Sequence, residues 1–240
     1  MIKLEKKESI YFLTMDAGEN RWNTTFVREI AKALDTIEDD EGQGALITSS
    51  TDSKFFSNGL DLEWMQAPED HPDGGDREVF GEEFMYLMGR FITLPIPTVC
   101  ALNGHTFGAG FMFALSHDFR IMREDKGFIC ANEMQLGLPI PRPELALFKH
   151  KIPANAFFET VQLSKRWTGA DALKAGIVQG VSSFEELSEA ALRKAKELAP
   201  LANNRKNFGH QKEMLYGENA AINLAHGPAH MLKNSKNFEI

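Results

Sequence analysis

The stretch Ala101-Leu-Asn-Gly-His-Thr-Phe-Gly-Ala-Gly-Phe-Met112 carries the most information about this chain. It overlaps an apolar run at 98–102 that is typical of a β-strand, and it leads into a second apolar run at 111–115. Glycines at a strand-to-helix junction let another group approach the backbone closely and leave N–H groups free at the helix N-terminus. Such N–H groups bind anionic oxygen, so the stretch predicts an oxyanion or phosphate site. Tight packing of a helix against a sheet is the alternative that the stretch alone leaves open.

The composition bounds the class of protein. The chain has 240 residues, 43% hydrophobic and 25% charged, which is ordinary for a soluble globular protein with one large domain. A net charge of −8 argues against nucleic acid as the main partner, although one anionic small molecule can still bind a local positive patch. No apolar run reaches the roughly 18 residues of a membrane span, so no membrane partner is expected. The N-terminus lacks the apolar core of a signal peptide, and we predict a cytoplasmic protein.

The cysteines and histidines predict no metal site. Cys100 and Cys130 each lie inside an apolar run, as small core residues do in a reducing compartment. The seven histidines are scattered, and His226 and His230 are the only pair at helical i, i+4 spacing. Zinc binding would require a third ligand, which this pair lacks.

Strand-like and helix-like segments alternate along most of the chain. Strands are expected over 2–4, 10–15, 44–49, 98–102, 118–122, 127–130 and 176–178. Helices are expected after an N-cap at Thr24 and over 79–94, 108–116, 142–150, 154–163, 169–175 and 184–198. The alternation predicts an α/β fold. We expect a core of residues 1–200 and a helical tail of residues 201–240 that packs on the core or on a neighbouring subunit.

Three segments together indicate one chemical site. The loop 54–62 and the glycine-rich turn 103–110 each follow an apolar strand, and the segment 127–138 runs from a strand into a single carboxylate, Glu133. The two loops can supply backbone N–H donors, and the carboxylate can act as a base. Chemistry next to a carbonyl group requires two donors on the oxygen and one group that moves a proton. For Glu133 taken alone, an exposed carboxylate that closes a strand is the alternative.

These motifs resemble those of the crotonase superfamily, the enoyl-CoA hydratases and isomerases. The first is Phe56-Ser-Asn-Gly-Leu-Asp-Leu62 and the second is Asn103-Gly-His-Thr-Phe-Gly-Ala-Gly110. Asp118 and Ala172-Leu-Lys-Ala-Gly-Ile-Val178 also match family signatures, so the resemblance covers about residues 1–200. It implies a repeated ββα spiral core, an acyl-CoA thioester substrate, and assembly as a homotrimer or a dimer of trimers. No separate cofactor is implied, because coenzyme A is part of the substrate.

The resemblance also implies roles for individual residues. The backbone N–H groups of Leu60 and Ala109 would form an oxyanion hole for the thioester oxygen, and each donor would stabilise the developing enolate by about 3–4 kcal/mol. Substrate contacts are expected from the same two loops, namely Ser57, Asn58, Gly59, Asp61, Gly108 and Met112. Arg21 and Lys54 are candidates for the CoA phosphates, although a solvated surface cation is the more common role. Asp61 is also suited to orient its own loop through Asx-type hydrogen bonds.

The number of carboxylates separates the activities within the superfamily. Hydratases use two glutamates, and the first of these positions holds Met112 here, which cannot activate water. Glu133 holds the second position, which resembles the Δ3-Δ2-enoyl-CoA isomerases, as does the segment Gly137-Leu-Pro-Ile-Pro141. One carboxylate can take a proton from C2 and return it at C4 without water. Apolar residues around Glu133 should disfavour its charged form and strengthen it as a base.

Two other kinds of function stay open at this point. Hydration, thioester hydrolysis or decarboxylation would need a second polar group near Met112, and Glu144 and His105 are the candidates. Glu144 follows a proline-containing stretch that stands where many hydratases carry glycines. A non-catalytic acyl-CoA-binding protein is the other alternative, and the presence of Glu133 argues against it.

Overall fold

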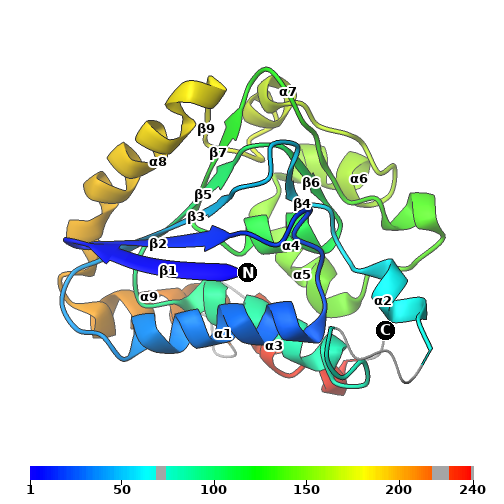
Figure 1. Ribbon diagram of the computed structural model, residues 1–240, viewed down its shortest axis with the longest axis horizontal. Coiled ribbons are helices and arrows are strands. Elements are labelled where there is room, and N and C mark those ends of the chain that lie inside the picture. The colour runs from blue at the N-terminus through cyan, green and yellow to red at the C-terminus, as the bar shows by residue number, and fades with distance from the viewer. Residues whose placement is uncertain (69–73, 218–226, 239–240) are drawn as a thin grey trace.

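Two β-sheets form the centre of the computed structural model, which describes residues 1–68, 74–217 and 227–238 (Figure 1). The large sheet has the strand order β1-β2-β3-β5-β7-β9, formed by Ile2–Lys7, Ile10–Met15, Ala45–Ser50, Thr98–Leu102, Phe119–Arg123 and Gly180–Ser182. β1 and β2 form an antiparallel hairpin, and the other neighbours in this sheet are parallel. The small parallel sheet has the order β4-β6-β8, formed by Phe55–Ser57, His105–Phe107 and Ile129–Cys130.

The chain alternates between the two sheets in a repeated pattern. Each of β3, β5 and β7 is followed by a strand of the small sheet and then by helical structure. The helical segments are α2 (Leu62–Gln66), α3 (Phe80–Thr93), α4 (Ala109–Leu115), the 3-10 turn η1 (Glu133–Leu136) and α5 (Arg142–Lys151). This confirms the predicted ββα spiral. Because β4, β6 and β8 are parallel neighbours, the three segments that follow them emerge side by side, and these carry the predicted site.

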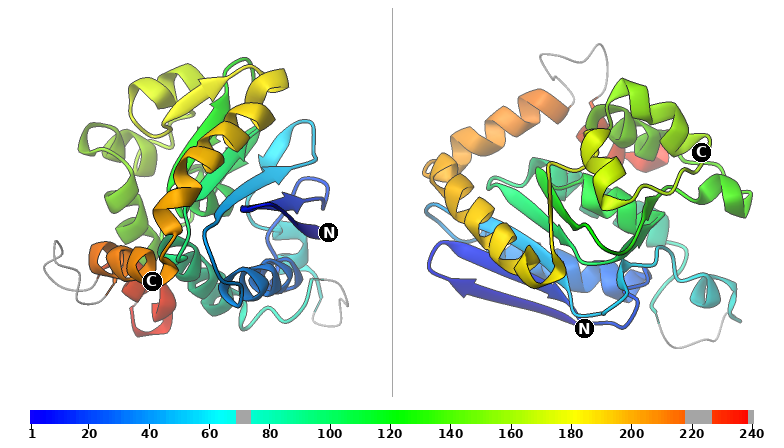
Figure 2. Two further views of the ribbon diagram at one scale, coloured as in Figure 1. Left: turned by 90° about the vertical axis from the view of Figure 1, so that its left-hand side faces the viewer. Right: turned by 90° about the horizontal axis from the view of Figure 1, so that it is seen from above.

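The central strands of the large sheet are buried on both faces, because they alternate apolar side chains between two hydrophobic clusters. In β5, Val99 and Ala101 pack beneath α8 (Phe184–Leu198), whereas Cys100 faces the main core. Figure 2 shows α8 lying across the strands of the large sheet. The main core lies on the other side and includes apolar residues of α3, α4 and α1 (Thr24–Glu38). Both cysteines are buried, as predicted.

The N-cap of α1 is Asn23 and not Thr24, which corrects the sequence prediction. The side-chain oxygen of Asn23 accepts a hydrogen bond from the Phe26 N–H at 2.9 Å. Thr24 is the first residue inside the helix, and its hydroxyl donates to the Asp76 carbonyl oxygen. Asparagine and threonine are both good N-cap residues, so their residue types do not distinguish the two positions. The contact of Thr24 with Asp76, a residue distant in sequence, distinguishes them here.

The predicted strand over 176–178 is wrong, because β9 lies further along the chain. The Ile177 N–H donates to the Ala172 carbonyl oxygen at 2.8 Å and closes the end of α7 (Gly169–Lys174). The Ile177 carbonyl oxygen accepts from the buried guanidinium of Arg120 at 2.9 Å. Both backbone groups of Ile177 are engaged outside the sheet, so this apolar segment ends a helix.

The C-terminal region packs against the core through α9 (Arg205–Tyr216) and α10 (Pro228–Lys233). α10 lies against α3 and α5, and its apolar residues join the main core. In α9, the ammonium of Lys212 lies 2.7 Å from the carboxylate of Asp118, and the lysine is buried. This ion pair joins the helix to the start of β7.

The remaining helical segments are α6 (Ala154–Val161), η2 (Ala199–Ala202) and η3 (Ser235–Asn237). Across the ranges that the structure describes, no helix has both the length and the apolar character to cross a membrane. Two parts of the predicted tail, 218–226 and 239–240, lie outside the described residues.

Candidate active site

The loop after β4 presents one backbone N–H group to a cavity. Leu60 lies beside Trp22 in an isolated parallel bridge. The bridge is held by bonds from the Trp22 N–H to the Gly59 carbonyl oxygen at 2.9 Å and from the Asp61 N–H to the Trp22 carbonyl oxygen at 3.0 Å. These bonds use the residues on either side of Leu60. Within the described part of the chain the Leu60 N–H donates to no acceptor, so an entering oxygen atom can use it.

The turn before α4 presents a second N–H group. Gly108 has a φ of +49°, which side chains disfavour, and its N–H donates to the Cys130 carbonyl oxygen at 3.0 Å. α4 then begins at Ala109, whose N–H finds no acceptor among the residues that the structure describes. A Cβ on Gly59 would stand 3.9 Å from the Ala109 nitrogen, so the two loops are adjacent. Two free donors at neighbouring positions are what an oxyanion hole requires.

Ser57 supports the first loop from inside the core. Its side chain is completely buried, and its hydroxyl accepts from Trp22 Nε1 at 3.0 Å and donates to the Asn20 carbonyl oxygen at 2.8 Å. α4 approaches so closely at Gly110 that an added Cβ would lie 2.6 Å from the serine side chain. The predicted contact of Ser57 with substrate is therefore wrong, and the residue ties the loop to the core.

Glu133 stands at the wall of a cavity of about 160 Å³ that both loops line. Its Oε1 atom lies 3.2 Å from the position that a Cβ on Gly108 would take. Its Oε2 atom is buried and has no hydrogen-bond partner in the described structure. Burial raises the pKa of Glu133, which makes the ionised form a stronger base. This placement contradicts the alternative of an exposed carboxylate at the end of a strand.

The cavity brings together several of the predicted substrate contacts. Asn58, Gly59, Gly108 and Arg21 line it together with Leu60, Ala109 and Glu133. Four further residues line the cavity and were not predicted as substrate contacts, namely Leu62, Asn132, Leu136 and Leu138. All four lie inside the predicted segments 54–62 and 127–138, and Leu136 is one of the apolar residues expected around Glu133.

Glu19 organises one side of this cavity. Its carboxylate accepts from Asn58 Nδ2 at 2.8 Å and lies 2.7 Å from Arg21 Nη2. One acidic side chain thus holds two cavity-lining side chains in place.

Besides Ser57, three predicted substrate contacts lie away from the cavity lining. Met112 is completely buried in the main core, so its predicted contact is wrong. Asp61 caps α2 by accepting from the Trp64 N–H at 3.1 Å, which confirms the Asx-type role. Lys54 is exposed, and its ammonium lies 4.9 Å from the centroid of the Phe55 ring. Asp61 and Lys54 do not line the cavity.

The two alternative polar candidates differ in their surroundings. Glu144 is buried in the first turn of α5, and burial together with the Glu133 carboxylate raises its pKa well above the usual range. The ring of His105 lies among the rings of Phe55, Phe107 and Phe128, and burial lowers its pKa. Glu144 is therefore the candidate that interacts with the predicted base.

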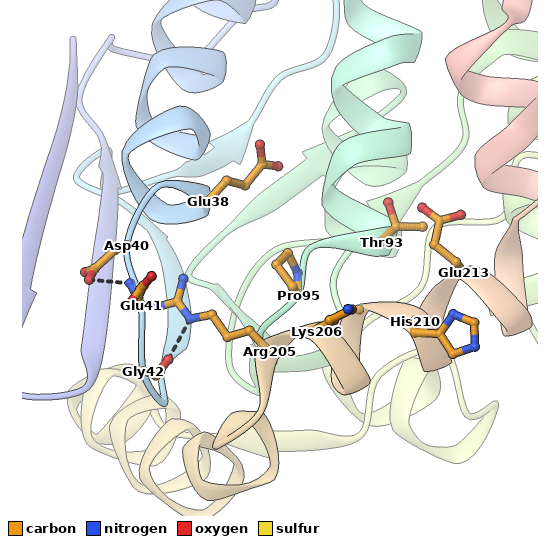
Figure 3. Close-up of a pocket in the computed structure, with 11 residues that line it drawn as sticks. Glu38, Asp40, Glu41, Gly42, Thr93, Pro95, Arg205, Lys206, His210 and Glu213 are labelled. Carbon is orange, nitrogen blue, oxygen red and sulfur yellow. Dashed lines mark hydrogen bonds between the residues drawn. The ribbon is translucent and has the colours of Figure 1, made fainter.

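A larger hollow of about 590 Å³ lies between the ends of α1 and α3 and the start of α9 (Figure 3). Arg205 spans it and donates to the Gly42 carbonyl oxygen at 2.6 Å. Its lining mixes acidic and basic side chains and includes none of the predicted site residues.

Among the described residues, no group of three potential metal ligands (His, Cys, Asp or Glu) comes together. His226, one member of the predicted pair, lies outside that range.

Comparison with known proteins adds an independent line of support. The sequence model of the enoyl-CoA hydratase/isomerase family matches residues 5–230. The chain belongs to this family. The match spans both N–H loops and Glu133, so the family resemblance inferred from the motifs is confirmed.

Three members of the family illustrate the extent of the similarity. Peroxisomal enoyl-CoA delta isomerase 2 of Arabidopsis thaliana is 32% identical over 227 residues, covering 92% of this chain and 95% of that protein. Human mitochondrial delta3-delta2-enoyl-CoA isomerase superposes with a TM-score of 0.79 at 25% identity, covering 89% of this chain and 82% of the human one. Carnitinyl-CoA dehydratase of Salmonella typhi is 33% identical over 172 residues, covering 70% of this chain and 63% of that protein.

Proposed function

We propose that this protein is an enoyl-CoA isomerase that moves a double bond from C3 to C2 of an acyl-CoA thioester. The observation that carries the proposal is one small cavity lined by the carboxylate of Glu133 and by Leu60 and Ala109, whose N–H groups have no acceptor in the described structure. Three plant relatives named enoyl-CoA delta isomerase, 31% to 33% identical, support the same reaction.

The proposed reaction balances with one base and two donors. The thioester oxygen accepts hydrogen bonds from the N–H groups of Leu60 and Ala109. Glu133 takes a proton from C2, and the electron pair of that C–H bond forms a dienolate whose charge the two donors stabilise. Glu133 then gives the proton to C4, and the double bond ends between C2 and C3. No water and no redox change enter this balance, so no separate cofactor is needed.

The surroundings of the cavity suit a proton shuttle better than a reaction that uses water as a substrate. Leu60, Leu136 and Leu138 line the space next to Glu133. The side chain of Met112 is buried where hydratases carry their first glutamate, so this position offers no acid for a water molecule. Exclusion of water also strengthens the hydrogen bonds to a developing oxyanion.

The decisive test is conversion of a 3-enoyl-CoA to the conjugated 2-enoyl-CoA, followed by ultraviolet absorbance. Wild type should form the conjugated product, and Glu133→Gln should lose about 10²- to 10⁴-fold in rate, as expected for removal of a general base. Glu189→Gln, on the exposed face of α8, is the matched control and should keep full activity. Near-full activity in Glu133→Gln would contradict the proposal, and binding without turnover in wild type would favour a non-catalytic acyl-CoA-binding protein.

Hydration is the second candidate function, because Glu144 could supply the acid that the Met112 position lacks. The electrostatic interaction of Glu144 with Glu133 and the similarity to carnitinyl-CoA dehydratase support this alternative. Incubation with a 2-enoyl-CoA in water separates the two functions. A hydratase would form a 3-hydroxyacyl-CoA by adding water, whereas the proposed isomerase would form no hydroxylated product and would only equilibrate the 2-enoyl-CoA with its 3-enoyl isomer.

Two further proposals concern the setting of the enzyme. We propose assembly as a homotrimer or a dimer of trimers, supported by exposed apolar side chains beside the cavity, such as Leu136, which is 51% exposed. Light scattering of the purified protein tests this, and a monomeric mass would reject it. We retain a cytoplasmic location as a proposal, which fractionation of cells tests. Relatives include peroxisomal proteins, so a peroxisomal signal is the outcome that would replace it.

A further inference from the structure

Asn132 is a polar residue of the cavity wall that the proposed reaction does not use. It directly precedes Glu133 and is half-buried. It is the N-cap residue of η1, and its carbonyl oxygen accepts from the Gln135 N–H at 3.0 Å. An asparagine at an N-cap normally also accepts a backbone N–H with its side chain. The side chain of Asn132 makes no such bond.

Two other asparagines of this chain show the usual cap. The side-chain oxygen of Asn23 accepts from the Phe26 N–H at 2.9 Å, and that of Asn204 accepts from the Asn207 N–H at 3.0 Å. Within the described residues the amide of Asn132 has neither this bond nor a bond to another side chain. It can therefore turn about the Cβ–Cγ bond, which exchanges the positions of its oxygen and its nitrogen.

The other cavity-lining side chains that carry N–H groups are held by one carboxylate. Asn58 Nδ2 donates to Glu19 at 2.8 Å, and Arg21 Nη2 lies 2.7 Å from the same carboxylate. Asn132 brings to the cavity an amide that no group of the described structure engages. Such an amide can gain its hydrogen bond from a ligand.

Gly108 brings this amide next to the proposed oxyanion hole. A Cβ added to Gly108 would lie 3.3 Å from Asn132 Oδ1 and 3.2 Å from Glu133 Oε1, so both side chains border the space that the missing side chain leaves open. The next residue along the chain is Ala109, whose N–H group is one of the two proposed donors. The base, the free amide and this N–H group therefore surround one glycine.

We propose that Asn132 is a further catalytic residue, whose Nδ2–H group donates a third hydrogen bond to the thioester oxygen. The inference rests on the proposed function, because that function places the oxygen at the N–H groups of Leu60 and Ala109. A half turn of the amide brings Nδ2 to the space that Oδ1 borders. Neutral amides serve as oxyanion donors, and the bond strengthens as the dienolate develops negative charge. Glu133 remains the base.

Replacement of two N-cap asparagines separates this role from helix capping. Asn132→Ala should lower kcat on a 3-enoyl-CoA by about 10²-fold with little change in KM, because the donor acts mainly on the dienolate. Its melting temperature should match that of wild type, since its side chain caps nothing. Asn204→Ala should show the opposite, with full activity and a melting temperature about 2–4 °C lower. Full kcat in Asn132→Ala would overturn the inference.

Asn132→Asp tests the donor with a residue that caps a helix as well as asparagine does. Aspartate has no N–H group in its side chain and brings a negative charge next to Glu133 and the dienolate. This variant should lose at least as much in kcat as Asn132→Ala. Wild-type activity in Asn132→Asp would show that the amide donates nothing to the reaction, and the inference would fall.

The carbonyl stretch of bound 2-enoyl-CoA, isotope-labelled at the thioester carbon, tests the contact independently of the rate. Each hydrogen bond to the thioester oxygen lowers the frequency of this band. Asn132→Ala should therefore shift the band less than wild type does, and Asn204→Ala should shift it equally. Equal shifts in wild type and Asn132→Ala would contradict the inference. If wild type does not isomerise a 3-enoyl-CoA, the proposed function fails, whereas this band still reports whether Asn132 contacts the thioester.

Discussion

Replacement of Gly110 by alanine should separate the two N–H groups of the proposed oxyanion hole. Gly110 lies in α4, one residue after Ala109, and an added Cβ would stand 2.6 Å from the side chain and 2.9 Å from the carbonyl oxygen of Ser57. Ser57 cannot yield easily, because its hydroxyl is hydrogen-bonded to Trp22 and Asn20. α4 must therefore move away from β4 by a substantial part of an ångström. Ala109 moves with the helix, while Leu60 stays with the loop after β4.

The size of the effect follows from this displacement. Overpacking of a core costs about 1–3 kcal/mol, which exceeds the gain of about 1 kcal/mol that alanine brings over glycine within a helix. A misplacement of about 1 Å in a catalytic arrangement can lower the rate by on the order of 100-fold. We expect Gly110→Ala to lose up to that factor in kcat on a 3-enoyl-CoA. Its melting temperature should fall by roughly 2–4 °C for each kcal/mol of destabilisation.

Gly81→Ala is the matched control. Gly81 lies in α3, and an added Cβ would meet nothing within 4 Å. This variant should keep full activity and gain up to about 1 kcal/mol in stability. Gly110→Ala and Gly81→Ala add the same methyl group at two helical positions. The ultraviolet assay compares their activities, and thermal unfolding compares their stabilities. If Gly110→Ala keeps full activity and melts no lower than wild type, the close contact between α4 and Ser57 does not set the donor geometry.

Three further predictions follow from buried polar groups. Ser57→Ala leaves the indole N–H of Trp22 without an acceptor and should destabilise the protein by about 1–3 kcal/mol in denaturant unfolding, with little change in KM. Lys212→Met leaves Asp118 without its ion-pair partner and should cost about 3–5 kcal/mol of unfolding free energy. Glu144 has a raised pKa in the folded protein, so the folded state keeps a proton that the unfolded chain releases above about pH 4.3. Wild type should therefore lose stability relative to Glu144→Gln as the pH rises from that value toward the folded pKa.

Each of these predictions has its own control or contrary result. A large increase in KM for Ser57→Ala would restore a substrate contact to this residue. Lys206→Met, at an exposed position of the same helix, should change the unfolding free energy by less than about 0.5 kcal/mol, and an equal loss in both lysine variants would count against the ion pair. A stability difference between wild type and Glu144→Gln that does not change between pH 4 and pH 8 would show that Glu144 is ionised in the folded protein.

The sequence by itself determined the features that depend on neighbours along the chain. Short motifs predict features that depend on contacts within a few residues. Such features are the glycine at 108, the start of α4 at Ala109 and the cap formed by Asp61. The alternation of strands and helices predicted the α/β class, and the resemblance to the crotonase superfamily implied the ββα spiral, in which Glu133 follows β8.

Only the tertiary structure decided which of these side chains reach the cavity. Ser57, at the end of β4, binds Trp22 across 35 residues, and Met112, within α4, turns into the core, although the sequence predicted substrate contacts for both. The burial of Glu144, which raises the pKa of its carboxyl group, depends on how α5 packs against the core. Burial and pKa are set by segments that are distant in sequence, and a local pattern carries no information about which remote side chain will fill the adjacent space.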